Sequence, residues 1–202
     1  DIGANDGLSV SFFLSIFRDS NLFVFEPLKL NKNYLKKNNK NKIKYYNIAL
    51  GEKNTVEKIN IPYIVFFSYK IYLYAYSAIS KKKQHMYEIN KSLKTFFYYK
   101  KIKKKQLKIK IKTFDSFNIK PDIIKLDVEA YEDKVINGAK KTINKYKPLL
   151  YIERPTKQLI SYLKKRKYEM YIFDVRKDLF KKAYYQSKEY RNYYFIYKKK
   201  NI

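Results

Sequence analysis

The chain has 202 residues, with 46 Lys and Arg against 18 Asp and Glu, a net charge of +28, and no Cys or Trp. The absence of Cys excludes a disulfide scaffold, a thiolate zinc site and cysteine nucleophilic catalysis. Hydrophobic residues make up 46% of the chain, which is enough for one domain with a core, so the charge does not require disorder.

The basic residues are almost all lysine: 41 are Lys and only five are Arg. Lys, Asn, Ile, Tyr and Phe have A/T-rich codons and together make up more than half of the chain. A phosphate-binding face is expected to contain more Arg, whose planar guanidinium matches phosphate. We therefore favour codon bias over nucleic-acid binding as the origin of the charge, and keep nucleic acid as an alternative partner.

The sequence begins with Asp1 in the middle of a strand-to-helix pattern, so we interpret it as N-terminally truncated, with most of the first strand missing. No signal-peptide pattern is visible, and a cytoplasmic location is the default expectation. The longest apolar stretch, 61–79, is interrupted by Lys70 and alternates with the period of a strand. It therefore predicts no membrane span.

The first half of the chain predicts an apolar helix, a short buried strand, a polar helix and then a series of strands. The expected ranges are 8–18, 22–25, 28–38, 43–50 and 55–61, with strand character continuing through 63–76. A lysine-rich segment follows at 81–105, which we interpret as a helix over the core or an insertion. We expect acceptor specificity to reside within 63–105.

The second half begins with strict alternation of Leu107, Ile109 and Ile111 with lysines, which predicts a strand with one buried and one solvated face. A buried strand, a helix, a strand, a helix and two strands follow, at 122–128, 131–145, 148–152, 159–163, 168–175 and 193–197. This alternation predicts one α/β domain over 1–202, built on a doubly wound, mostly parallel, seven-stranded-type sheet. Ligands bind such sheets at the carboxyl ends of the strands.

Two features at predicted strand ends indicate a nucleoside site. The segment Asp1–Gly7 contains Gly3 and Gly7 at a strand-to-helix junction, where glycine allows close backbone approach. Glu26 ends the next strand about 20 residues later, where a carboxylate can accept hydrogen bonds from both ribose hydroxyls. The glycine spacing matches neither the dinucleotide fingerprint nor a P-loop, which disfavours a dehydrogenase.

Further motifs join these two in a recognisable order. The segments are Asp1–Gly7, Phe25–Pro27, Asn47–Gly51, Thr113–Asp115, Ile124–Glu132, Val135–Ala139 and Pro148–Glu153. With this set the chain resembles the FkbM-type S-adenosylmethionine-dependent methyltransferases, which have a Rossmann-like class I fold. Ala130 stands where the family usually has Gly, and a positive φ there would strain it.

The resemblance implies that S-adenosylmethionine is the cofactor and assigns its binding residues. It places Asp1, Gly3, Asn5 and Gly7 around the methionine part and Glu26 on the ribose. Asn47 and Ala49 would border the adenine, and Asp127 would lie beneath the sulfonium or amino group.

For removal of a proton from a hydroxyl acceptor, Glu129 is the first candidate base and Glu153 the second. Glu129 is equally suited to a structural role. Asp127, Glu129 and Glu153 could also converge on a divalent ion, but no sequence-local ligand cluster supports one, so no metal is expected. His85 lies in a polar segment and is interpreted as solvated, Glu132 as stabilising a helix start, and Gly138 as permitting tight packing.

The leading hypothesis is O-methylation of a hydroxyl on a small molecule or glycan, a reaction type that comes from the resemblance. One alternative is methylation of RNA or DNA through the basic surface. Another is a non-catalytic, anion-binding relic of the fold. The sequence does not reveal the oligomeric state.

Overall fold

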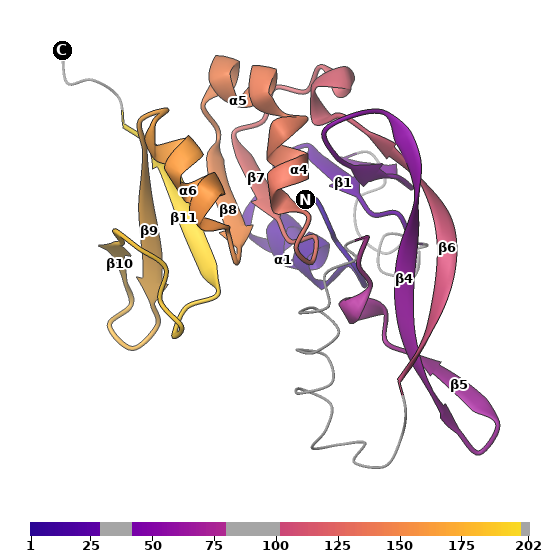
Figure 1. Cartoon of the computed structure of the whole chain (residues 1–202). Helices are drawn as coiled ribbons and strands as arrows, with labels where there is room; N and C mark the ends of the chain where they lie inside the picture. The colour runs from indigo at the N-terminus through magenta and orange to yellow at the C-terminus, as the bar shows by residue number, and fades with distance from the viewer. Residues whose placement is uncertain (29–41, 80–101, 199–202) are drawn as a thin grey trace.

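The computed structural model describes residues 1–28, 42–79 and 102–198, which form two sheets with flanking helices (Figure 1). The helices are α1 (Leu8–Ile16), α4 (Glu132–Asn137), α5 (Lys140–Tyr146) and α6 (Lys157–Lys164), with short 3-10 turns η1 (Tyr74–Tyr76) and η2 (Phe114–Phe117). The strands are β1 (Leu22–Phe25), β2 (Ile43–Tyr46), β3 (Ala49–Leu50), β4 (Thr55–Phe66), β5 (Tyr69–Tyr72), β6 (Lys103–Lys112), β7 (Ile123–Leu126), β8 (Leu149–Glu153), β9 (Tyr168–Asp174), β10 (Leu179–Lys182) and β11 (Asn192–Tyr197).

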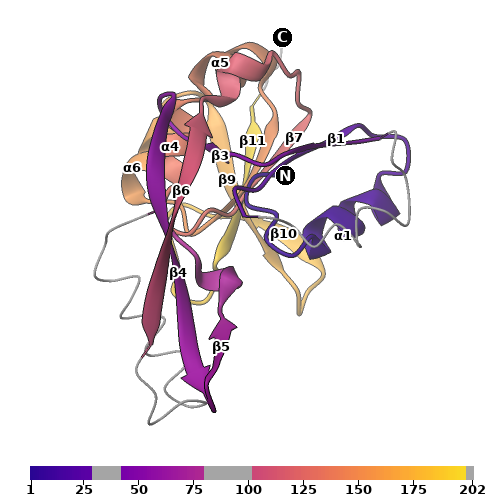
Figure 2. The same ribbon diagram turned by 90° about the vertical axis from the view of Figure 1, so that its right-hand side faces the viewer.

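The first sheet consists of the β1–β2 pair and the five strands β10-β9-β11-β8-β7. Residue Ile2 joins these two parts, because it makes parallel bridges to Phe25 in β1 and to Leu126 in β7. The pairs β1–β2 and β7–β8 are parallel, whereas β11 runs antiparallel to both β8 and β9. Helix α1 lies on the opposite side of this sheet from α4, α5 and α6 (Figure 2).

The second sheet has the order β3-β6-β4-β5 and is built on two long, curved strands. β4 pairs antiparallel with β6 from Thr55 opposite Ile111 to Tyr63 opposite Lys103. Beyond this ladder, β4 continues into a hairpin with β5 that projects from the body of the molecule (Figures 1 and 2). The predicted alternation is present at Ile109 and Ile111, which are buried between exposed lysines, but Leu107, expected on the same buried face, is exposed.

The prediction of a doubly wound, mostly parallel, Rossmann-like sheet is wrong. Five of the eight strand pairs in the described residues are antiparallel, and the strands are divided between two mixed sheets. A parallel connection needs a crossover of about a dozen residues or more, whereas β4–β5 and β9–β10 are joined by short turns. The sequence interpretation missed β10 and treated successive strands as if helices separated them.

The helix predictions are confirmed in outline. Val135, Ile136, Ala139 and Ile143 are all buried, but they belong to two helices, because the predicted helix over 131–145 is interrupted at Gly138. The predicted polar helix over 28–38 and the segment 81–105 lie largely outside the described residues, as does His85. Lys103 to Lys105, the end of that segment, are in β6 and not in a helix.

The main core lies between the first sheet and helices α4, α5 and α6, where Leu126, Ile143, Leu150, Ile152, Leu163 and Phe195 are completely buried. The predicted close packing at Gly138 is present. A Cβ atom there would lie 1.9 Å from the carbonyl oxygen of Gly51, so only glycine fits against the second sheet. Within the described residues, no helix has both the length and the apolar character needed to cross a membrane.

Candidate functional site

A cavity of about 340 Å³ opens beyond the carboxyl ends of β1, β7 and β8. Most of the residues singled out in the sequence line it: Gly3, Asn5, Glu26, Ala49, Asp127, Glu129 and Glu153. Asp1, Gly7 and Asn47 do not line it. Seven of the ten candidate residues therefore lie together at one cavity, although the sheet as a whole differs from the predicted one.

The glycine loop approaches the end of β7 very closely. Gly3 has a φ of 79°, and a Cβ atom there would lie 1.8 Å from the carbonyl oxygen of Asp127, so glycine is required on both conformational and steric grounds. Asn5 also adopts a positive φ. Gly7, with a φ of 90°, is the N-cap of α1, where its conformation turns the loop into the helix. Gly7 thus shapes the loop from outside the cavity.

Glu26 is a buried carboxylate at the end of β1. One of its oxygens accepts a hydrogen bond from the Asn5 backbone N–H at 3.0 Å, and the other accepts one from the Leu28 N–H at 2.9 Å. Burial raises the pKa of Glu26 to about 7 against the lowering effect of these hydrogen bonds. The amide of Asn47 donates to the carbonyls of Glu26 and Pro27, so Asn47 holds this loop from behind.

Lys125 is a functional candidate that the sequence interpretation missed. Its side chain is 10% exposed, and its Nζ atom lies 3.1 Å from Asp1 Oδ1, 3.3 Å from the Gly3 carbonyl and 3.7 Å from Asp127 Oδ2. Burial lowers the pKa of Lys125, while the nearby carboxylates, Asp127 first, raise it. Asp1 is fully buried and also accepts a hydrogen bond from Ser9 in α1 at 2.6 Å. A lone lysine within the apolar strand 123–126 was the available signal.

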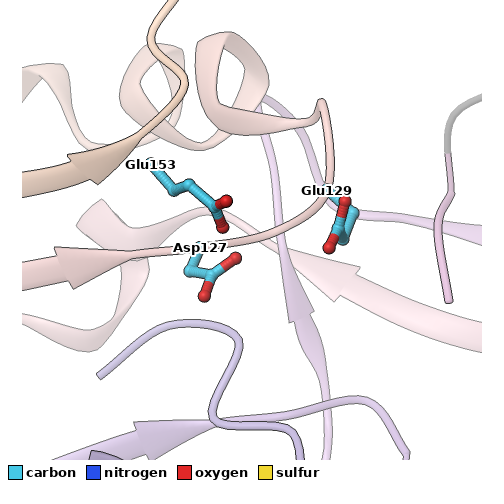
Figure 3. A group of neighbouring side chains, drawn as sticks. All are labelled: Asp127, Glu129 and Glu153. Atoms are coloured by element: carbon cyan, nitrogen blue, oxygen red, sulfur yellow. The ribbon is translucent and has the colours of Figure 1, made fainter. Parts of the chain in front are cut away.

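Asp127, Glu129 and Glu153 form a cluster of carboxylates at the cavity (Figure 3). One oxygen from each lies within 4.8 Å of the others, which is close enough for all three to coordinate one divalent cation. Without a cation, burial and the hydrogen bond with Asp127 raise the pKa of Glu153 to about 8. Glu153 is therefore largely protonated at neutral pH and exchanges its proton near that pH, which is a suitable property for an acid–base group.

The loop that carries Glu129 has a strained backbone. Glu129 and Ala130 have φ values of 49° and 67°, in the left-handed region that favours glycine. The strain expected for Ala130 at a positive φ is therefore present. The carboxylate of Glu132 accepts a hydrogen bond from the Val128 N–H at 3.2 Å and so supports this loop at the start of α4. Burial raises the pKa of Glu132 to about 7.

The opposite wall of the cavity comes from the second sheet, from η1 and from the residues after η1, with Ile59, Tyr74, Tyr76, Ser77 and Ile79. Tyr131 before α4 and the basic Arg191 before β11 also line the cavity. The Ser77 hydroxyl is buried and has no hydrogen-bond partner among the residues that the structure describes. None of these residues had been assigned a role from the sequence, although 74–79 falls in the segment expected to determine specificity. Their only signal was the strand-like run of aromatic residues.

Comparisons with known proteins give consistent results. The family model described as "Methyltransferase FkbM domain" matches residues 1–170. The fold is similar to the crystal structure of methyltransferase FkbM from Methylobacillus flagellatus KT, with a TM-score of 0.55 and 15% sequence identity. That likeness covers 98% of this chain and 42% of the other, so this chain spans less than half of its length. A search of curated proteins gave no match.

Replacement of Lys125 by Met is expected to lower the free energy of unfolding by about 3 to 5 kcal/mol, because it leaves the buried carboxylate of Asp1 without its cation. Denaturant unfolding measures this loss. Asp1→Asn is expected to destabilise the wild type, but to restore part of the lost stability in the Lys125→Met variant, because it removes the unpaired carboxylate. The matched control is Lys108→Met on the exposed face of β6, where a change within about 0.5 kcal/mol is expected. Equal effects of the two lysine variants would contradict the assigned role.

The raised pKa of Glu132 predicts a pH-dependent stability. Between its unfolded pKa near 4.5 and its folded pKa near 7, the folded state binds the proton more tightly. This contribution is therefore present at low pH and is lost as the pH rises through 7. Relative to wild type, Glu132→Gln is expected to gain about 2 to 3 kcal/mol of stability between pH 5 and pH 8.

The control for this experiment is Glu169→Gln. Glu169 is partly exposed to solvent, and its hydrogen bond from Lys182 lowers its pKa, so it stays ionised in both states over this range. Its difference from wild type is expected to be flat between pH 5 and pH 8. A flat difference for Glu132→Gln as well would show that Glu132 is ionised in the folded protein at pH 5.

Proposed function

The chain belongs to the family of methyltransferase FkbM domains, and we propose that it transfers the methyl group of S-adenosylmethionine to a hydroxyl oxygen of a small molecule or glycan. The observation that carries this proposal is the charge of the cavity. In a protein of net charge +28, four carboxylates, Glu26, Asp127, Glu129 and Glu153, line a single cavity at the ends of the parallel strands.

The gathering of carboxylates supports a cationic ligand, because a bound cation would favour their ionised forms. S-adenosylmethionine carries a sulfonium and an ammonium group, and carboxylates that face these groups would stabilise both. The same carboxylates would repel phosphate groups, so the cavity favours a neutral acceptor over a nucleic acid. Among the residues that the structure describes, most lysines are exposed and do not line the cavity.

The residues at the cavity fit the cofactor. The volume is within the range of about 300 to 1,000 Å³ that is typical of small-molecule sites. Each oxygen of Glu26 accepts one backbone N–H and keeps a second lone pair, which leaves acceptors for two ribose hydroxyls. Gly3 and Asn5 would border the methionine part, Ala49 the adenine, and Asp127 the sulfonium or amino group.

When bound, S-adenosylmethionine supplies an electrophilic methyl group, and the protein must orient the acceptor and accept its proton. We assign the role of proton acceptor to Glu153, because it lines the cavity beside Asp127 and burial raises its pKa to about 8. Glu129 is the second candidate. The positive charges of Lys125 and Arg154 offset the negative charge that forms when Glu153 ionises. Lys125 lies near Asp127, and Arg154 lies near Glu153 and favours its ionised form. The strained Glu129–Ala130 turn would orient the cluster toward the acceptor.

A thermal-shift titration tests the cofactor. At about 100 times Kd, S-adenosylmethionine and S-adenosylhomocysteine are each expected to stabilise the protein by about 2.7 kcal/mol, which raises Tm by several degrees. NAD is expected to give no shift. Glu26→Gln is expected to weaken binding about tenfold or more, whereas the exposed control Glu189→Gln should bind as wild type does. Absence of a shift with both sulfur compounds would leave the non-catalytic relic as the better interpretation.

The assignment of the base predicts a pH profile. Because Glu153 accepts a proton only when ionised, kcat/KM is expected to rise about tenfold per pH unit below its pKa of about 8 and to level off above it. The measurement is S-adenosylhomocysteine formation over a panel of hydroxylated acceptors. Glu153→Gln is expected to lower kcat by about 10² to 10⁴ while it retains cofactor binding.

Two comparisons distinguish this assignment from its alternatives. Glu129→Gln is the matched variant in the same cluster, and a larger loss there than in Glu153→Gln would identify Glu129 as the base. Assays in EDTA and in Mg²⁺ give the second comparison. A rate that depends on Mg²⁺ would show that the three carboxylates hold a cation.

A further inference from the structure

The projecting β4–β5 hairpin carries apolar side chains at its apex. Phe67 is 82% exposed and Tyr69 is 77% exposed, and the neighbouring Phe66 and Ile71 are also exposed. The hairpin extends away from both sheets' cores in Figures 1 and 2. Nearly complete exposure of a large aromatic side chain is unfavourable in water, so this apex is suited to contact with an apolar partner.

The turn itself is not optimised for a solvated hairpin. Phe66 pairs with Tyr69, and the two turn residues Phe67 and Ser68 have φ values of 43° and 70°. Two-residue turns with positive φ at both positions normally contain Asn-Gly or Asp-Gly, because a bulky side chain is strained in this conformation. Phe67 thus occupies a position where a small polar residue would fold more easily, and it presents a phenyl ring at the most distant point of the arm.

Lysines lie immediately behind the apolar apex. Lys70 follows Tyr69, and Lys103, Lys104 and Lys105 pair with the β4 residues 61–63, three to five residues behind Phe66. At a rise of about 3.3 Å per residue, Lys103 is about 10 Å behind the apex. Between residues 58 and 114 the sequence contains one acidic residue, Glu88. The arm is therefore apolar at its tip and basic along its shaft.

We propose that the β4–β5 hairpin docks the protein on an anionic lipid surface. The apolar tip would reach about 5 to 10 Å into the boundary between headgroups and acyl chains, which places the shaft lysines at the level of the lipid phosphates. β5 continues directly into η1, whose tyrosines line the cavity. The segment that contacts the membrane would therefore be connected directly to one wall of the cavity.

The geometry favours a lipid surface over single-stranded RNA. Base stacking needs open aromatic faces along a basic groove. Here the Nζ atoms of Lys70 and Lys105 lie 5.7 Å and 5.5 Å over the rings of Tyr63 and Tyr72, and Phe66 and Phe67 meet edge to face.

Sedimentation with vesicles tests the proposal, using phosphatidylcholine alone and phosphatidylcholine mixed with phosphatidylglycerol. The wild type is expected to bind the mixed vesicles and to bind the neutral vesicles much more weakly. Phe67→Asn, which suits the turn conformation, combined with Phe66→Ser is expected to weaken binding about tenfold or more. The matched control is Tyr184→Ser with Tyr185→Ser, two adjacent exposed aromatic residues away from the arm, for which unchanged binding is expected.

A second pair of variants tests the charge. Lys103→Gln, Lys104→Gln and Lys105→Gln together are expected to weaken binding more than the equal charge change at Lys140, Lys141 and Lys145 in α5. If the Phe66→Ser, Phe67→Asn double variant does not fold, the single variant Phe67→Asn replaces it and is also expected to weaken binding. The proposal is overturned if the wild type does not bind the mixed vesicles, or if tip and control variants bind them equally. Competition of vesicle binding by single-stranded RNA, with RNA binding lost in the tip variant, would instead assign the arm to nucleic acid.

Discussion

The architecture of the site depends on one buried cation. The ammonium group of Lys125 bonds the Asp1 carboxylate and the Gly3 carbonyl and lies near Asp127, so it links the glycine loop to the end of β7. Asp1 in turn binds Ser9, which extends the link to α1. A lysine with so little exposure is stable only because carboxylates surround it, and those carboxylates are stable there because of the lysine.

This arrangement separates the charges of the protein by location. Most lysines in the described residues are exposed, whereas the cavity contains more carboxylates than cations. Burial raises the pKa values of Glu26, Glu132 and Glu153 to between about 7 and 8, so these groups exchange protons near neutral pH. The cavity can therefore adjust its charge to a bound cation or to proton transfer, and the distant lysines are largely screened from it by solvent.

Much of the site was predictable from the sequence, because side chains at the ends of parallel strands gather at one edge whatever the rest of the sheet does. Glu26, Asp127 and Glu153 meet for that reason. Lys125 was missed because the local sequence does not show whether the ammonium group of a single lysine in a short apolar strand is buried or solvated. The second sheet was missed because local alternation identifies a solvated strand, such as that at Leu107 to Ile111, without identifying its partner.

The two walls of the cavity belong to different sheets, so its width depends on the contacts between them. Gly138, at the end of α4, packs directly on the carbonyl of Gly51 after β3, and neither position leaves room for a side chain. The hydroxyl of Tyr131 donates to Glu57 in β4 at 3.2 Å, and burial raises the pKa of Tyr131 to about 12, so this hydroxyl remains a donor at neutral pH. Because Tyr131 directly precedes α4 and follows the Glu129–Ala130 turn, the same short segment orients the carboxylates and fixes the opposite wall. Contacts on both sides of the turn therefore maintain its strained backbone: the hydrogen bond from Val128 to Glu132 on one side and that from Tyr131 to Glu57 on the other.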